Sequence, residues 1–221
     1  MGTKDEIIKT ARQLFLIKGY DKTSIQNIID GTDIAKGTFY HYFKSKEDLL
    51  NQYSEIEVKA LYSIAEEIGN SDLNPIEKFE TLFKKSSSWK SENVKSMKTL
   101  FKVMMSKENL YLRDAMLQNQ RKQLAPIFSK IINEGRAQGI FNVIDCDFTA
   151  ILIIDIFSGL TNKVATYLSA PEYTPEILNA FKDLMFNIQD TISRILGLKN
   201  KTLEIVDKDK LEMLIKGLME N

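Results

Sequence analysis

The chain has 221 residues, of which 43% are hydrophobic and 27% are charged. This composition is too apolar for a disordered protein, and the length allows one or two domains with hydrophobic cores. The 30 basic residues balance the 30 acidic residues, so the net charge draws the chain neither to nucleic acid nor to an acidic membrane, and any nucleic-acid site must be local.

The apolar residues recur with helical spacing along the whole chain. The first predicted helix buries one face, formed by Ile7, Ile8, Ala11, Leu14 and Phe15. Thr3 and Glu6 have the spacing of a capping box at its start, and Gly19 is a stop signal at its end.

Three more helices are predicted before the first clear loop, at Gly69–Asn74. A short second helix begins at Thr23 or Ser24, where Thr23 and Gln26 have capping-box spacing, and it ends before Gly31. A third helix runs from about 35 to 43. A fourth begins at Ser45, in a Ser-Lys-Glu-Asp segment that again has capping spacing.

The remaining helices are expected at about 75–88, 93–106, 108–137, 147–169, 175–196 and 208–219. Asn74-Pro75 and Thr174-Pro175 are start signals, because a capping residue precedes a proline at the first helical position. No segment shows the alternating pattern of a strand. The sequence therefore predicts an all-α fold.

Several classes of site and of location are disfavoured. One cysteine, Cys146, allows no internal disulfide or Cys-rich zinc site, and one histidine, His41, allows no multi-His metal centre. The longest apolar stretch, 148–160, is interrupted by Asp155 and is too short for a membrane span. Residues 1–18 do not have the pattern of a secretion signal. We expect a cytoplasmic protein with no cofactor.

The segment 23–43 has the spacing of a helix-turn-helix, with two short helices following a longer one. On a helical wheel, Phe39 and Phe43 point to one side, while Gly37, Thr38 and His41 point roughly opposite. Between residues 34 and 46 there are three lysines and no acidic residue, which makes this stretch tolerant of a polyanion.

Individual residues of the segment suit particular contacts with DNA. Gly37 allows a close approach of the backbone, and Thr38 suits a thymine methyl group or a phosphate. Tyr40, His41 and Tyr42 carry donors suited to phosphates. Taken singly, each of these five also has an ordinary structural interpretation, as a first-turn glycine, a surface threonine or a half-buried packing residue.

Lys46 lies in the first turn of the fourth helix, where a cation opposes the helix dipole. This placement is explained if Lys46 and the helix terminus together hold a phosphate. Ser24 and Gln26 are interpreted first as caps of the second helix and second as DNA contacts.

Residues 7–50 resemble the DNA-binding domain of the tetracycline-repressor (TetR/AcrR) family, above all in the run from Lys36 to Leu49 (KGTFYHYFKSKEDL). Glu134–Phe141 also resembles the turn that precedes the two dimerisation helices of that family. The resemblance implies a bacterial one-component regulator, usually a repressor, that forms a homodimer, binds an inverted-repeat operator and carries a divergent ligand domain. It places the DNA contacts on Lys36, Gly37, Thr38, Tyr40, His41, Tyr42 and Lys46, with further contacts near Ser24 to Gln26.

Two positions depart from the usual family pattern, in which Gly, Val and Ser precede the recognition helix. Asp33 takes the place of the glycine and tolerates a left-handed turn, but it adds a negative charge near the DNA face. Ala35 takes the place of the serine and cannot cap the recognition helix with its side chain.

We therefore divide the chain into a helix-turn-helix DNA-binding domain at 1–46, with the motif at about 24–43, and a helical ligand-binding and dimerisation domain at 47–221. The candidate ligand contacts are Trp89, Phe101, Met104, Met105, Asp155 and Phe157. Apolar side chains of this kind line ligand pockets, and they equally form an ordinary helical core. Asp155 lies between two isoleucines, where a dimer contact, a ligand contact and a solvent-facing position are all open interpretations.

An enzyme is not expected, because no nucleophile–histidine set or phosphate-binding glycine loop can be assembled from this sequence. The remaining alternative is a helical small-molecule-binding or protein-interaction module that retains a non-functional helix-turn-helix shape. The effector, the operator sequence, the sign of the regulation and the role of the helix at 208–219 are not determined by the sequence.

Overall fold

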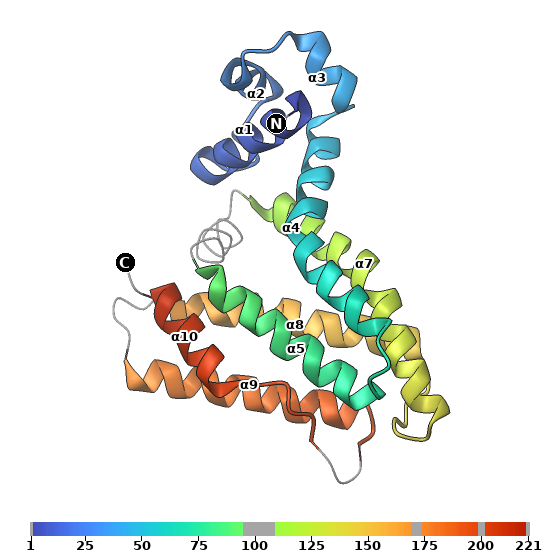
Figure 1. Ribbon diagram of the computed structural model, residues 1–221. Coiled ribbons are helices and arrows are strands. Elements are labelled where there is room, and N and C mark those ends of the chain that lie inside the picture. Colours follow the sequence, from blue (N-terminus) through green and yellow to red (C-terminus); the bar gives the residue numbers. More distant parts are fainter. Residues whose placement is uncertain (1, 95–108, 169–173, 199–201, 220–221) are drawn as a thin grey trace. The chain divides into compact units, whose positions relative to one another are not determined.

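The computed structural model describes residues 2–94, 109–168, 174–198 and 202–219, and within these ranges it contains helices and no strand (Figure 1). The predicted all-α fold is thus confirmed. The predicted helix at 93–106 lies almost entirely outside the described residues. The helices are α1 (Thr3–Lys18), α2 (Ile25–Thr32), α3 (Lys36–Tyr42), α4 (Lys46–Gly69), α5 (Pro75–Glu92), α7 (Leu110–Ala137), α8 (Cys146–Leu168), α9 (Pro175–Ile195) and α10 (Lys208–Met219).

The predicted start signals of α5 and α9 are confirmed. The Asn74 side chain accepts hydrogen bonds from the backbone N–H groups of Ile76 and Glu77, both at 3.0 Å. The Thr174 hydroxyl accepts from the N–H of Ile177 at 3.4 Å. In each case the proline that follows occupies the first helical position, where the missing N–H has no intrahelical partner to lose.

The predicted capping box at the start of α1 is wrong. Thr3 is already the first helical residue, and the N-cap is Gly2, whose N–H donates to the Asp5 carboxylate at 3.2 Å. The box is shifted by one residue, and Asp5 takes the role that was predicted for Glu6. The predicted stop is confirmed, since Gly19 has a φ of 83° and its N–H donates to the carbonyl of Phe15.

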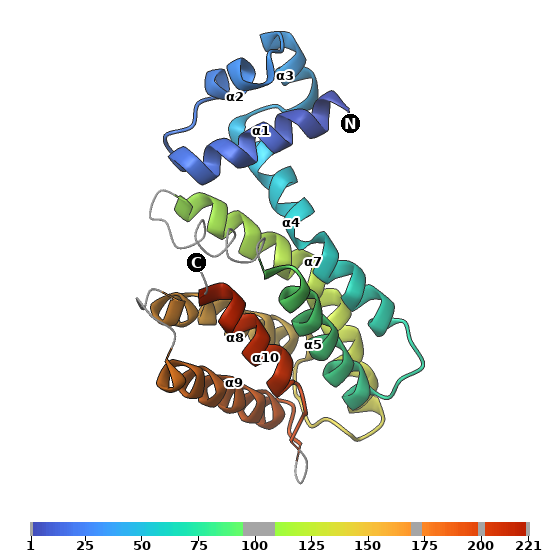
Figure 2. The same ribbon diagram turned by 60° about the vertical axis from the view of Figure 1, so that its left-hand side comes forward.

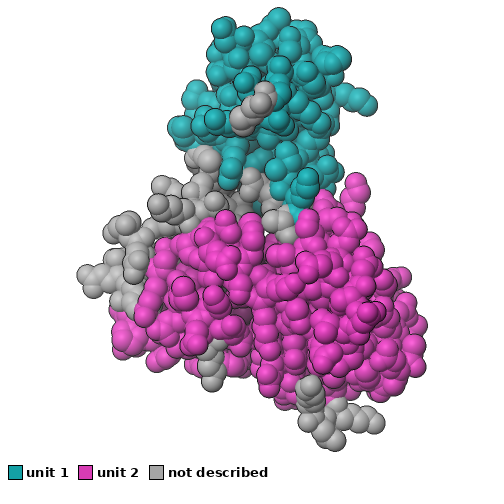
Figure 3. Space-filling view, viewed as in Figure 1, with its two compact units in different colours: residues 1–59, 99–120 teal, residues 60–98, 121–221 magenta. Residues whose placement is uncertain are grey.

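The chain divides into two compact units (Figure 3). Unit 1 comprises the residues up to Lys59 together with the described residues 109–120, and unit 2 comprises Ala60–94 and the described residues from Arg121 onwards. The packing units therefore do not coincide with the functional division proposed at residue 46. In particular, α4 and α7 each contribute their first part to unit 1 and their remainder to unit 2.

The core of unit 1 combines the first four helices with the first turns of α7. Its fully buried side chains include Phe15, Phe39 and Phe43, which join the predicted face of α1 to the buried side of α3. Leu112, at the start of α7, is buried in the same cluster. The helix-turn-helix is thus held by a core to which residues nearly a hundred positions further along the chain contribute.

The core of unit 2 is aromatic and aliphatic. Phe79 of α5 packs edge-on against Phe128 and Phe141 at centroid distances of 5.6 and 5.9 Å. α10 lies beside α5 and α9 (Figures 1 and 2). The segment that leads into α10 is fixed by side chains of α9, because Ser193 accepts from the N–H of Leu203 and Gln189 accepts from the N–H of Ile205.

The segment Glu134–Phe141 forms a tight turn at the end of α7. Gly139 adopts a left-handed conformation with a φ of 70°, and the N–H groups of Ile140 and Phe141 both donate to the carbonyl of Gly135. A Cβ atom at Gly135 would lie 2.1 Å from the ring of Phe141, so only glycine fits there. The turn directs the chain toward α8, where Cys146 is the first helical residue and is buried.

Candidate nucleic-acid interface

α2 begins with a reciprocal pair of hydrogen bonds. The Ser24 hydroxyl accepts from the N–H of Asn27, and the Asn27 side chain accepts from the N–H of Ser24, both at 3.1 Å. The capping box is therefore Ser24–Asn27 rather than the predicted Thr23–Gln26. Thr23 is buried and donates to the carbonyl of Gly19, while Gln26 is exposed and donates to Asp30 at 2.6 Å.

The turn between α2 and α3 depends on Asp33, which has a φ of 52° and a ψ of 45°. This left-handed conformation confirms the expectation from the sequence, and Asp33 is the only described non-glycine residue with a positive φ. Ala35 occupies the N-cap of α3 without a side-chain hydrogen bond, also as expected. The first turn of α3 is consequently not capped by a side chain.

α3 has the two faces that the helical wheel predicts. Phe39 and Phe43 are completely buried, and their ring centroids are 5.6 Å apart. On the other side, Lys36, Gly37 and His41 are exposed. Tyr40 is 47% exposed, whereas Thr38 and Tyr42 are half-buried. Lys36, Gly37, Tyr40 and His41 are thus accessible on α3, whereas Tyr42 packs against the core of unit 1.

Gly37 has no packing reason to be glycine. A Cβ atom built at this position would have no neighbouring atom within 4 Å, and its φ is not in the left-handed region. A larger residue would therefore fit the free protein. This observation favours close approach to a ligand over internal packing as the reason for a glycine at this position.

Lys46 is held within unit 1. Its ammonium group donates to the carbonyls of Tyr20 at 3.0 Å and Thr23 at 3.1 Å, and it lies 4.1 Å from the centroid of the Tyr20 ring. The side chain is half-buried. In the free protein it therefore ties the start of α4 to the turn between α1 and α2, and its predicted phosphate contact stays a prediction.

The first turn of α4 is capped by residues around Ser45, as its spacing predicts. The Ser45 hydroxyl accepts from the N–H of Asp48, and the Asp48 carboxylate accepts from the N–H of Lys44 at 2.8 Å. The hydrogen bond from the Lys44 N–H, and to a smaller extent one from the Gln52 side chain, lowers the pKa of Asp48. The cap leaves the Lys44 side chain exposed beside α3.

Tyr20 was not singled out from the sequence. Only 4% of it is exposed, and burial together with the nearby carboxylate of Glu47 raises the pKa of its phenol to about 12. An aromatic residue directly after the helix-stop Gly19 is the available signal, because such a residue is placed to fold back onto the helix core.

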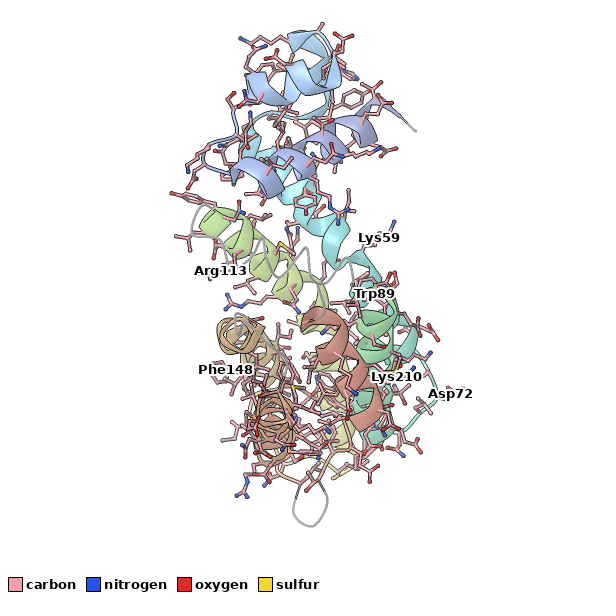
Figure 4. All side chains as sticks on the ribbon, turned by 90° about the vertical axis from the view of Figure 1, so that its left-hand side faces the viewer. Lys59, Asp72, Trp89, Arg113, Phe148 and Lys210 are labelled. Carbon is pink, nitrogen blue, oxygen red and sulfur yellow. The ribbon has the colours of Figure 1, made fainter. Side chains whose placement is uncertain are left out.

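The structure describes three of the six candidate ligand residues, Trp89, Asp155 and Phe157. Phe101, Met104 and Met105 lie outside the described residues. Trp89 is half-buried on α5 (Figure 4), and Phe157 of α8 stacks on Phe83 at 4.7 Å. Asp155 forms an ion pair with Arg121 of the same chain at 2.6 Å. Its side chain is 35% exposed, so its charge is partnered inside unit 2 and still accessible to solvent.

A second surface, on α8, has the opposite chemistry. Phe148, Ile151 and Leu152 share one helical face and are 64%, 39% and 36% exposed (Figure 4 labels Phe148). Ile144, just before the helix, is completely exposed. Three neighbouring apolar residues on one helix face are typical of an interaction surface.

Within the described ranges, no group of three or more His, Cys, Asp or Glu side chains is arranged to hold a metal ion. Among the helices described, none has the length and apolarity that crossing a bilayer requires.

Comparison with known proteins gives a consistent result. The family described as "Bacterial regulatory proteins, tetR family" matches residues 7–53, which include α2, α3 and the start of α4. The transcriptional repressor KstR2 of Mycobacterium tuberculosis is 24% identical over 138 residues, which span 62% of this chain and 68% of that protein.

Solved structures extend the likeness to most of the fold. A putative TetR-family regulator from Syntrophomonas wolfei superposes with a TM-score of 0.65 at 22% identity, covering 90% of this chain and 97% of that one. FadR of Thermus thermophilus, a TetR-family repressor solved with lauroyl-CoA, gives 0.55 at 19% identity, covering 88% and 93%. At these identities the structures support a shared fold and nothing finer.

Proposed function

The chain belongs to the tetR family of bacterial regulatory proteins, and from that premise we propose that it is a one-component transcriptional regulator. It represses by binding duplex DNA as a homodimer, and an apolar or amphipathic small molecule releases it. The observation that carries the proposal is the outward face of α3, where Lys36, Gly37 and His41 are exposed beside two completely buried phenylalanines.

The proposed contacts with DNA divide into two kinds. Contacts of the first kind are made to phosphates and fix the register of α3 in the major groove. They come from Lys36, Tyr40, His41, Tyr42 and Lys46. Thr38 meets a base edge, where its methyl group suits thymine, and Gly37 lets the backbone approach. Ser24 and Gln26, at the start of α2, contact the sugar-phosphate backbone of the DNA. A change at Thr38 should therefore alter preference at one base position, and a change at a lysine should weaken binding to all sequences.

The proposed dimer forms through α8 and α9. Pairing the exposed face of Phe148, Ile151 and Leu152 with its symmetry mate removes that surface from water and gives a four-helix interface. A two-fold dimer presents two recognition helices, so the operator must contain inverted half-sites.

Release by the effector requires coupling between its site and α3. α4 and α7 are candidates for transmitting it, because each contributes residues to both units. A tenfold loss of DNA affinity needs about 1.4 kcal/mol of difference between the two states, which a few apolar contacts supply. An acyl-CoA is a reasonable first compound to test, since one structural neighbour holds lauroyl-CoA and the core of unit 2 is rich in phenylalanine.

The decisive experiment selects bound sequences from random duplex DNA and repeats the selection with lauroyl-CoA or metabolite extracts. We expect an inverted-repeat consensus, a steep dependence of affinity on salt, and loss of binding with an effector. By reciprocity, the operator should weaken effector binding by the same factor. Failure to enrich any sequence, together with weak salt dependence, would favour the alternative of a binding module with an unused helix-turn-helix.

A further inference from the structure

Tyr20 is held by each of its polar groups and by its ring. Its N–H donates to the side-chain carbonyl of Asn109 at 2.7 Å, and its carbonyl accepts from Lys46 at 3.0 Å. Its ring lies under the Lys46 ammonium and 6.0 Å from the ring of Tyr111. Its hydroxyl forms a hydrogen bond with Glu47. Residue 20 is thereby fixed by the first turn of α4 and by residues at the start of α7.

The position of Tyr20 determines where α2 begins. The N–H of Thr23 donates to the carbonyl of Tyr20, and the buried Thr23 hydroxyl donates to the carbonyl of Gly19. The next residue, Ser24, is the N-cap of α2. These hydrogen bonds restrict the conformation of residues 19–24, so the position of Tyr20 limits the position of α2. α2 in turn connects to α3 through the tight turn at Asp33.

Asn109 is the distant member of this arrangement. It lies 89 positions from Tyr20 in the sequence, only 2% of it is exposed, and its side-chain nitrogen is 3.5 Å from the carbonyl of Phe15. It immediately precedes α7. A buried backbone N–H without an acceptor costs folding free energy. The hydrogen bond from the Tyr20 N–H therefore stabilises the conformation in which the Asn109 side chain lies beside Tyr20.

We propose that Asn109 is a positioning residue for DNA binding, which sets the turn between α1 and α2, and with it α3, by holding the N–H of Tyr20. The inference rests on the proposed function and adds a site of regulation to it. A change at the start of α7 that withdraws Asn109 lowers the fraction of molecules in which α3 is correctly placed. The apparent affinity for DNA then falls in proportion to that fraction.

The test compares Asn109→Ala with Asn119→Ala. Asn119 is a second buried asparagine of α7, but its side chain contacts Asn51 and Ser54 of α4 and does not reach the turn. Both variants should melt at a lower temperature. Only Asn109→Ala should weaken operator binding of the folded dimer, by about tenfold, and speed hydrogen exchange of the Tyr20 amide. The fluorescence of Trp89, the single tryptophan, should be unchanged because it reports on unit 2.

The proposal is overturned if Asn109→Ala binds the operator as tightly as the native chain, if the Tyr20 amide of Asn109→Ala exchanges no faster than in the native chain, or if Asn119→Ala loses equal affinity. A native chain that enriches no duplex sequence contradicts the proposed function instead, and the exchange of the Tyr20 amide then still reports whether Asn109 holds it.

Discussion

The two outward surfaces on α3 and α8 have opposite chemistry. On α3, Lys36, Gly37, Tyr40 and His41 are exposed, and Phe39 is completely buried. On α8, Phe148, Ile151 and Leu152 are exposed although the helix also buries Ile153 and Ile154. α3 therefore suits a hydrated polyanion, whereas α8 suits an apolar partner such as its own symmetry mate.

The difference shows how a chain of zero net charge can present one surface suited to a polyanion and another suited to an apolar partner. The run from Ile34 to Lys46 contains three lysines and no acidic residue, so this segment is locally positive although the other 27 basic residues are distributed over the rest of the chain. On α8, Phe148, Ile151 and Leu152 are exposed together on one helical face, whereas Ile17, Ile56 and Met213 are exposed on other helices. Bulk composition predicts neither surface.

The largest expected effect comes from placing a charge on the face of α8. Phe148→Glu should raise the dissociation constant of the dimer by on the order of a hundredfold, because two-fold symmetry buries the new carboxylate twice. Sedimentation velocity at micromolar concentration measures it. Met213→Glu, at a residue of α10 that is 58% exposed, is the control and should leave the dimer intact. A dimer that persists in Phe148→Glu would place the interface elsewhere.

The next effect tests α3 without disturbing its packing. Gly37→Ala meets no neighbouring atom, so the melting temperature should be unchanged or slightly higher. Operator binding should weaken by about tenfold if the backbone of Gly37 approaches DNA closely. Fluorescence anisotropy with labelled operator measures the affinity. Unchanged affinity would mean that the glycine serves neither DNA binding nor packing.

A smaller effect distinguishes two lysines of the same surface. Lys36→Ala should flatten the salt dependence of binding by about one unit of slope and leave the melting temperature unchanged. Lys46→Ala should flatten the slope in the same way and also lower the melting temperature, because its ammonium binds the carbonyls of Tyr20 and Thr23. A native binding curve for Lys46→Ala at low salt would remove Lys46 from the DNA contacts.

The smallest effect concerns the pKa of Tyr20. Because burial raises this pKa to about 12, above the value of about 10 in the unfolded chain, the folded state holds the phenol proton more tightly. Its contribution to stability is complete below pH 10 and is lost as the pH rises from 10 to 12. Urea unfolding at pH 9 and 11 should show a loss on the order of 1 kcal/mol that Tyr20→Phe does not share. An equal loss of stability in both proteins would show that Tyr20 is not its source.

Much of the fold was predictable because it depends on local signals. The helix starts at Asn74 and Thr174, the stop at Gly19 and the left-handed Asp33 each follow from the conformational preferences of a few neighbouring residues. The errors were also local. Thr23 and Gln26 have capping-box spacing, but in the structure Ser24 is the N-cap of α2. Thr23 cannot take this role because its hydroxyl donates to the carbonyl of Gly19.

The candidate site was predictable to the extent that it lies on one helix. The periodicity of α3 separates buried Phe39 and Phe43 from exposed Lys36 and His41, since both sets are fixed by the same helical repeat. Gln26 was assigned less well, because its side chain is bonded to Asp30 and takes no part in the cap.

The sequence by itself determined the all-α fold, the helix-turn-helix and the acid-free segment at 34–46, because each of these follows from residues within a turn or two of one another. Only the tertiary structure decided that Asn109 holds Tyr20, that Lys46 binds the turn between α1 and α2, and that Asp155 pairs with Arg121. These partners are 89, 26 and 34 positions apart in the sequence. Helical periodicity indicates which face of a helix is buried, but only the packing of distant helices determines which polar atoms meet there.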